Sequence, residues 1–148
     1  MTEPISWRDF ARVWPDLAAI GHDMLYAFDV GLAFLATVRS DGGPRVHPVC
    51  PIFVDDRLYT MVIPGPKQHD LMRHSRYALH SETFPPPRED DGFYLSGRVT
   101  EVDQAFFELL VERALLTLTS GRDGFPRGST IWKATSAHRT RPTRASGQ

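Results

Sequence analysis

The chain has 148 residues, which is long enough for one domain with a substantial core and too short for two. Its 17 basic and 18 acidic side chains give a net charge of −1, so we expect no nucleic-acid partner and no membrane partner. No stretch of the sequence approaches the length of a membrane span, and a single cysteine, Cys50, excludes an intrachain disulfide. These features predict a cytoplasmic protein in which Cys50 is a buried structural thiol.

The first thirty residues have the pattern of short helices. Aromatic and apolar residues recur at helical spacing over residues 6–14, which predicts an amphipathic helix. Pro15 interrupts this pattern, and a second short helix is expected over about residues 16–20. We therefore expect residues 1–30 to form a helical segment that covers the core.

A three-strand meander follows and leads into a helix. Residues 32–39, 46–54 and 58–63 are rich in β-branched and aromatic side chains and are separated by Gly- and Asp-containing turns. Gly65 and Pro66 then break the extended chain, and Pro66 suits the first position of a helix that runs to about residue 74. The meander thus delivers the chain directly to a helix N-terminus.

That helix start has the features of an anion site. The first amides of a helix have no partner within the helix, the positive end of its dipole lies there, and Lys67 adds a full charge. We expect four backbone amides and Lys67 to converge where a phosphate would fit. The alternative is an exposed first-turn lysine with no ligand.

The remainder of the chain supplies strands, a loop and one more predicted helix. Strands are expected over residues 77–82, 92–102 and 129–135, with a proline-rich loop after the first of them. From Asp103 the apolar period changes, which predicts an amphipathic helix to about Leu118. We interpret residues 1–137 as one domain and 138–148 as a disordered tail. Short antiparallel strands with few helices favour a mainly β barrel.

The meander, the helix start and the Asp-Leu-Met-Arg-His-Ser-Arg-Tyr-Ala-Leu-His run after it together resemble the pyridoxamine 5′-phosphate oxidase-like flavin-binding split-barrel family. The resemblance spans about Leu32 to Val102 and depends on the order Ala-Thr-Val, Asp-Gly, Pro-Val, Leu-Tyr and the helix-opening lysine. It implies a six-stranded antiparallel split β-barrel of the FMN-binding type, with flanking helices. It also implies a homodimer that holds FMN at the subunit interface, and an oxidoreductase that passes hydride between the flavin and a small organic molecule.

The resemblance also implies which residues touch the cofactor. Two strands of the meander would run along the isoalloxazine ring, Lys67 would hold the phosphate, and Trp132 of the partner chain would flank the ring. The implied strand contacts are Val46, His47, Pro48, Val49, Tyr59, Thr60, Met61 and Val62. The alternatives are an edge strand with a partly exposed His47, and Trp132 as a core or interface residue. Gly65 and Pro66 stand where many family members have serine and arginine, so one phosphate partner is missing.

Other chemistries find little support in the sequence. The six histidines do not form zinc-like pairs with cysteines, so no metal is expected, and no hydrolase or nucleotide-binding motif occurs. The catalytic residues stay unassigned. Two alternatives remain open: a deazaflavin-dependent reductase, whose acidic coenzyme tail could use Arg39, Arg45 and Arg73, and a non-catalytic flavin- or haem-binding module with His47 or His80 as iron ligand.

Overall fold

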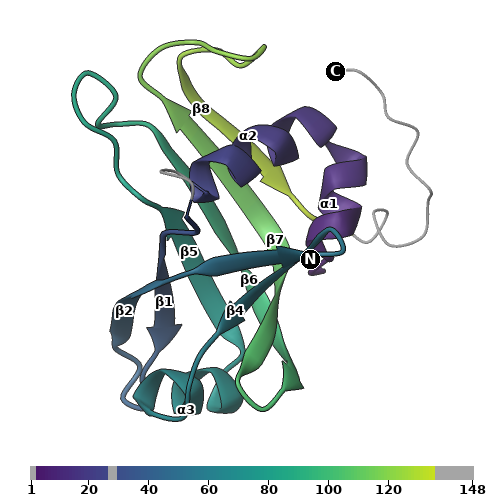
Figure 1. Cartoon of the computed structure of the whole chain (residues 1–148), viewed down its shortest axis with the longest axis vertical. Coiled ribbons are helices and arrows are strands. Elements are labelled where there is room, and N and C mark those ends of the chain that lie inside the picture. Colours follow the sequence, from purple (N-terminus) through teal and green to yellow (C-terminus); the bar gives the residue numbers. More distant parts are fainter. Residues whose placement is uncertain (1–2, 27–29, 136–148) are drawn as a thin grey trace.

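A computed structural model describes residues 3–26 and 30–135, and Figure 1 shows a strongly curled sheet with helices at its two ends. The helices are α1 (Trp7–Val13), α2 (Pro15–Leu25) and α3 (Pro66–Arg73). The strands are β1 (Ala33–Val38), β2 (Pro44–Val49), β3 (Pro51–Val54), β4 (Arg57–Met61), β5 (Arg76–Ser81), β6 (Gly92–Asp103), β7 (Phe106–Leu118) and β8 (Gly128–Lys133). The predicted tail lies outside the described residues.

All strand pairs are antiparallel, and the order along the sheet is β2-β1-β5-β6-β7-β4-β3. β8 pairs with the second half of β7, whereas β4 pairs with its beginning. β2 and β3 occupy opposite ends of this order although one residue separates them in the chain, so the sheet must curl until its ends meet. The predicted mainly β, antiparallel split barrel is therefore confirmed.

Aromatic side chains attach the N-terminal helices to the sheet. Trp7 makes edge-to-face contacts with Phe10, Phe53 and Phe93, with ring centroids 5.1, 5.1 and 6.1 Å apart. α2 runs five residues beyond the predicted end because its buried residues continue at helical spacing to Leu25. No helix in residues 3–26 or 30–135 is both long and apolar enough to span a bilayer.

The predicted helix over residues 103–118 is wrong: this segment is β7. Its buried residues alternate from Phe107 to Val111 and again from Ala114 to Leu118, with a change of phase around Glu112. The phase changes because the pairing with β6 shifts register between Ser96 and Gly97. Leu, Glu and Ala favour helices, but pairing on both sides in the sheet overrides that preference.

The predicted strand over residues 46–54 divides into β2 and β3 at Cys50, which is exposed rather than buried. Pro48 and Pro51 flank this point and lack the amide that a continuous ladder would use. Because the predicted strand divides here and β7 replaces a predicted helix, residues 3–26 and 30–135 contain eight strands where six were expected. β2 is an edge strand, so half of its backbone groups face away from β1.

Gly97 is required where β6 and β7 approach at the register shift. A Cβ atom there would lie 2.0 Å from the carbonyl oxygen of Leu110, which also accepts the hydroxyl hydrogen of Tyr77. We predict that Gly97→Ala lowers the free energy of unfolding by about 2 kcal/mol, because the backbone must move to remove the overlap. Urea denaturation followed by tryptophan fluorescence measures this, with Ser96→Ala as control. Equal stability of both variants would contradict the prediction.

Candidate functional site

Helix α3 lies at the bottom of the barrel in Figure 1, below β2 and β4, and buried polar side chains fix it on both sides. On one side, Gln68 Nε2 donates hydrogen bonds to the carbonyl oxygens of Val62 and Gln104, at 2.9 and 3.1 Å. On the other side, Asp70 bonds to groups from β1 and β2. α3 is thus attached to β1 and β2 on one side, and to the residues that follow β4 and β6 on the other.

Asp70 is the centre of this attachment. Its side chain is 3% exposed and accepts hydrogen bonds from Thr37 Oγ1 at 2.8 Å, Arg45 Nε at 2.7 Å and an Arg73 guanidinium nitrogen at 3.1 Å. Burial raises the pKa of Asp70, but the hydrogen bonds from Arg45, Thr37 and Arg73 outweigh it and hold that pKa below the ordinary 3.8. Asp70 is therefore ionised at neutral pH and orients two arginines.

The helix start presents fewer amides than the sequence suggested. Pro66 has no amide hydrogen, and the His69 amide donates to the Gly65 carbonyl at 3.0 Å, so two amides rather than four remain, those of Lys67 and Gln68. Gly65 has a φ of 157°, which side-chain-bearing residues rarely adopt. Within the described residues, the Lys67 ammonium makes no hydrogen bond or ion pair.

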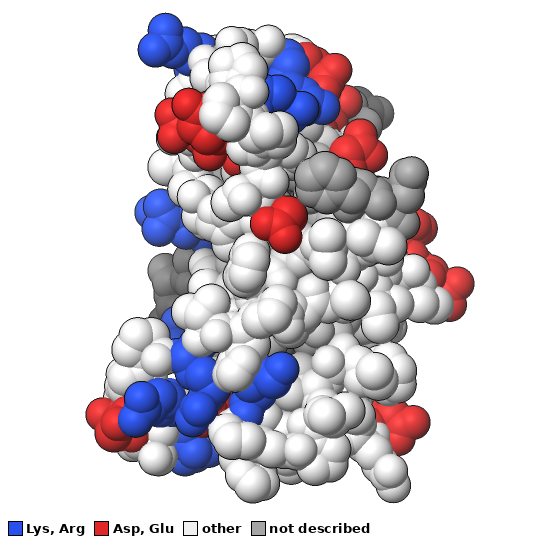
Figure 2. Space-filling view, turned by 60° about the vertical axis from the view of Figure 1, so that its left-hand side comes forward, with Lys and Arg blue, Asp and Glu red and all other residues white. Residues whose placement is uncertain are grey.

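Basic side chains gather around this helix start. Figure 2 shows the group at the lower left of the molecule, with one acidic group at its left edge. Arg45 and Arg73 pair with Asp70, and Arg39 pairs with Asp41 at 2.8 Å. With Lys67 added, four cations face two carboxylates, which leaves an excess of two positive charges. This matches the charge of one phosphate monoester.

His47 lies beside these charges on the inner face of the sheet. His47 lies directly opposite Leu35 of β1, which is fully buried. Arg45 lies opposite Thr37 in the same pair of strands. The His47 Nε2 atom is buried and has no hydrogen-bond partner among the described residues. Burial lowers the pKa of His47 below 6.5, and Lys67 and Arg45 lower it further, against an opposing effect of Asp70. The structure thus brings His47, Lys67 and Arg45 together.

The other predicted ring contacts are divided between two faces, because side chains alternate along a strand. Val46, Pro48 and Met61 are exposed, and Tyr59 is half-buried. Val49, Thr60 and Val62 are buried on the inner face, and the Thr60 hydroxyl has no partner there among the described groups. Trp132 is 8% exposed and packs on Phe10 at 4.8 Å, so its own chain covers most of its ring.

Sequence reasoning missed an apolar pocket on the outer face of the sheet. It has a volume of about 370 Å³. His80 and Tyr94 meet at its edge, with ring centroids 4.1 Å apart, and the His80 Nδ1 atom lies against the Ser81 carbonyl oxygen. The apolar lining includes Phe34, Ala36, Val46, Ala78 and Leu115. These residues alternate with core residues on four strands, so only their pairing in the sheet brings them together.

In residues 3–26 and 30–135, no three histidine, cysteine or acidic side chains form a group that could hold a metal ion. No protein-family model matches the sequence. No curated protein matches it either.

Solved structures do resemble this one. A pyridoxamine 5′-phosphate oxidase-related, FMN-binding protein from Nostoc punctiforme has a TM-score of 0.59 at 13% identity, with 84% of this chain and 90% of that chain covered. The fold is the pyridoxamine 5′-phosphate oxidase-like split barrel. A Clostridium acetobutylicum protein related to general stress protein 26, of the pyridoxinephosphate oxidase family, has a TM-score of 0.57 at 8% identity, covering 78% and 92%. The Vibrio cholerae heme storage protein HutZ has a TM-score of 0.52 at 10% identity, covering 68% and 91%.

We predict that Asp70→Asn lowers the free energy of unfolding at pH 7 by about 2 kcal/mol, because it removes a buried charge from three hydrogen bonds. Since the folded-state pKa of Asp70 lies below 3.8, this stabilisation is present above that pH and is lost as the pH falls through the folded-state value.

Urea denaturation at pH 7 and at about pH 3 tests this prediction. The stability difference between the natural protein and Asp70→Asn should shrink at the lower pH. Asp56→Asn, in an exposed turn, is the control and should match the natural protein. A difference that stays constant with pH would show that the carboxylate charge is not responsible.

Proposed function

We propose that this chain is an FMN-binding split-barrel oxidoreductase that passes hydride between the flavin and a small organic molecule. The observation that carries the proposal is the arrangement at the start of α3. An unpaired lysine, two unpaired amides and an oriented arginine lie together beside a buried histidine nitrogen that has no partner in the described residues. A solved structure with this fold that is named as an FMN-binding protein supports the same proposal.

The residues fit the phosphate end of the flavin. Lys67 and Arg45 would supply charge, and the amides of Lys67 and Gln68 would point at the phosphate oxygens along the helix dipole. Because Asp70 fixes Arg45 and the position of α3, these groups are in place before the ligand arrives. We assign the ring to β2, as the resemblance implies, because the outer edge of β2 has no neighbouring strand in the described sheet.

Bound flavin would supply the hydride chemistry, and the chain would hold it and orient a second molecule. Val46 belongs both to β2 and to the apolar outer pocket. A small organic molecule in that pocket would therefore lie next to the strand that we assign to the ring. We infer that the pocket receives the hydride acceptor or donor, and that its apolar lining excludes water from the reacting groups.

A second copy of the chain would complete this site. The outer face carries large apolar side chains that a monomer leaves exposed: Val46 is 60% exposed and Ile131 50%. The pocket between them opens on the same face, so a two-fold partner placed there would bury apolar residues and enclose the ring. We therefore propose a homodimer with the flavin at the interface.

Two observations bear on the alternatives. The excess of two positive charges at the start of α3 matches one phosphate monoester, which favours FMN over a coenzyme with a longer acidic tail. A haem-binding module has its own support, because the His80 Nδ1 atom lies against the Ser81 carbonyl and leaves Nε2 for a metal. The visible spectrum of the purified protein separates flavin, deazaflavin and haem.

We predict that Lys67→Ala weakens FMN binding about tenfold or more and leaves riboflavin binding nearly unchanged, because Lys67 contacts only the phosphate. Fluorescence titration with the two ligands measures both affinities. The control is Arg12→Ala, which removes a positive charge from an exposed position on α1. Equal losses for FMN and riboflavin would rule out the phosphate assignment.

We predict that Ala78→Asp converts a dimer into a monomer, because it places a charge on the exposed side of β5, within the outer pocket. Light scattering at micromolar concentration reports the mass. Ala19→Asp makes the same change on the exposed side of α2 and should leave the dimer intact. A natural protein that is monomeric and still binds FMN tightly would refute the proposed interface.

A further inference from the structure

His47 and its surroundings carry a further inference about the anion site. The His47 side chain projects from the middle of β2 onto the inner face, two positions after Arg45 and therefore on the same side of the strand. Arg45 in turn binds Asp70, which lies one helical turn after Lys67 in α3. The histidine thus belongs to one cluster with both cations that we assign to the phosphate.

The Nε2 atom of His47 needs a partner. It is buried, and neither the strands nor α3 offer it a hydrogen bond within the described residues. A buried polar atom without a partner is costly, and in native proteins it points to a group that completes the site. The neighbouring Lys67 and Arg45 make an anion the favoured partner. A phosphate oxygen accepts hydrogen bonds and would satisfy Nε2 as a donor.

We propose that His47 is an additional phosphate partner and that it takes up a proton when a phosphate monoester binds. This inference rests on the proposed FMN site and adds a coupling between binding and pH. Gly65 and Pro66 offer no side-chain hydrogen bond to a phosphate on the helix side, and His47 would supply one from β2.

The charges that face His47 explain the proton uptake. In the free protein, burial and the charges of Lys67 and Arg45 keep the ring neutral at pH 7, because they lower its pKa more than Asp70 raises it. A bound phosphate brings close to two negative charges and offsets both cations. The bound-state pKa of His47 then exceeds the free-state value, so affinity rises as the pH falls through the bound-state value towards the free-state one.

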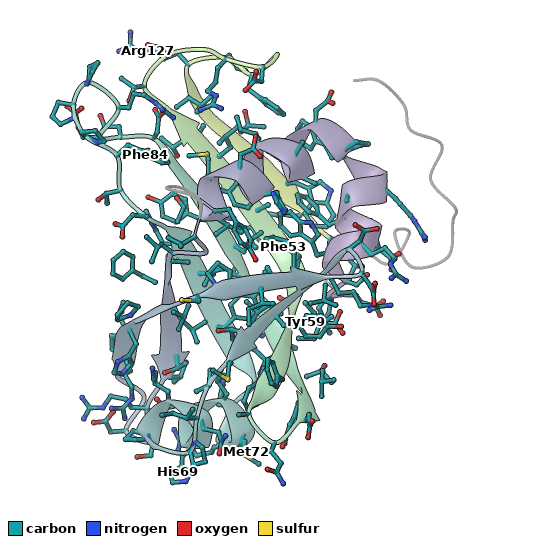
Figure 3. All side chains as sticks on the ribbon, viewed as in Figure 1. Phe53, Tyr59, His69, Met72, Phe84 and Arg127 are labelled. Carbon is teal, nitrogen blue, oxygen red and sulfur yellow. The ribbon has the colours of Figure 1, made fainter. Side chains whose placement is uncertain are left out.

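Calorimetric titration with FMN in buffers of different ionisation enthalpy counts the protons taken up. We expect uptake by the natural protein near pH 7, little uptake by His47→Gln, and no uptake with riboflavin. The control is His69→Gln: His69 is exposed on α3 and lies at the bottom of the molecule in Figure 3, and its variant should retain the uptake. Relative to His47→Gln, FMN affinity of the natural protein should rise about tenfold between about pH 8.5 and pH 6. The protonation of FMN itself is common to both proteins and cancels in this ratio.

A second readout does not depend on affinity. The ring proton resonances of His47, assigned by comparison with His47→Gln, should titrate at a higher pH with FMN than without it. FMN binding with no proton uptake, or with the same uptake in His47→Gln, would overturn this inference and leave the proposed function standing. A failure to bind FMN at any pH would overturn both.

Discussion

The bonds of Asp70 determine where the start of α3 lies. This carboxylate joins a helix to β1 through Thr37 and to β2 through Arg45, and it is buried, so its bonds are not shared with bulk water. Gln68 attaches the opposite side of the same helix to the end of β4. The eight-residue helix is too short to be stable alone, and these attachments fix its N-terminus beside the edge of β2. Without them Lys67 would be a solvated surface residue.

The alternation of side chains in a strand separates the roles of neighbouring residues. On β2, the inner face carries Arg45 and His47 towards α3, while Val46 faces the outer pocket. One edge strand therefore serves an anion site on one face and an apolar surface on the other. A flavin has the same division, with a charged phosphate at one end and a largely apolar ring at the other. The correspondence is the physical basis of the proposed function.

Local signals in the sequence predicted much of the fold. The turn around Gly42, the helix start at Pro66 and the alternating strands depend on neighbouring residues, and each was found within a few positions. The prediction of a helix for residues 103–118 was wrong because β7 pairs with β6 through a bulge, and this bulge interrupts the alternation of buried and exposed side chains. The exposure of Cys50 follows from the corner between β2 and β3, which depends on the closure of the whole sheet.

For the site too, the sequence indicated individual residues but not the contacts between distant parts of the chain. Lys67 was named from the helix start and His47 from the resemblance, and the structure brings them together. The network of Asp70 with Thr37 and Arg45 joins residues 33 and 25 positions apart, and no local pattern indicates such a contact. The outer pocket was missed for the same reason. Thr60 and Trp132 were assigned from the resemblance alone, and both lie in the interior of the chain.

The visible absorption spectrum of the purified protein, recorded before and after addition of FMN, tests the central claim most directly. We predict the two-banded flavin spectrum, with bands that shift and gain fine structure as FMN leaves water for the protein. A Soret band in the purified protein, or an FMN spectrum unchanged by excess protein, would contradict it.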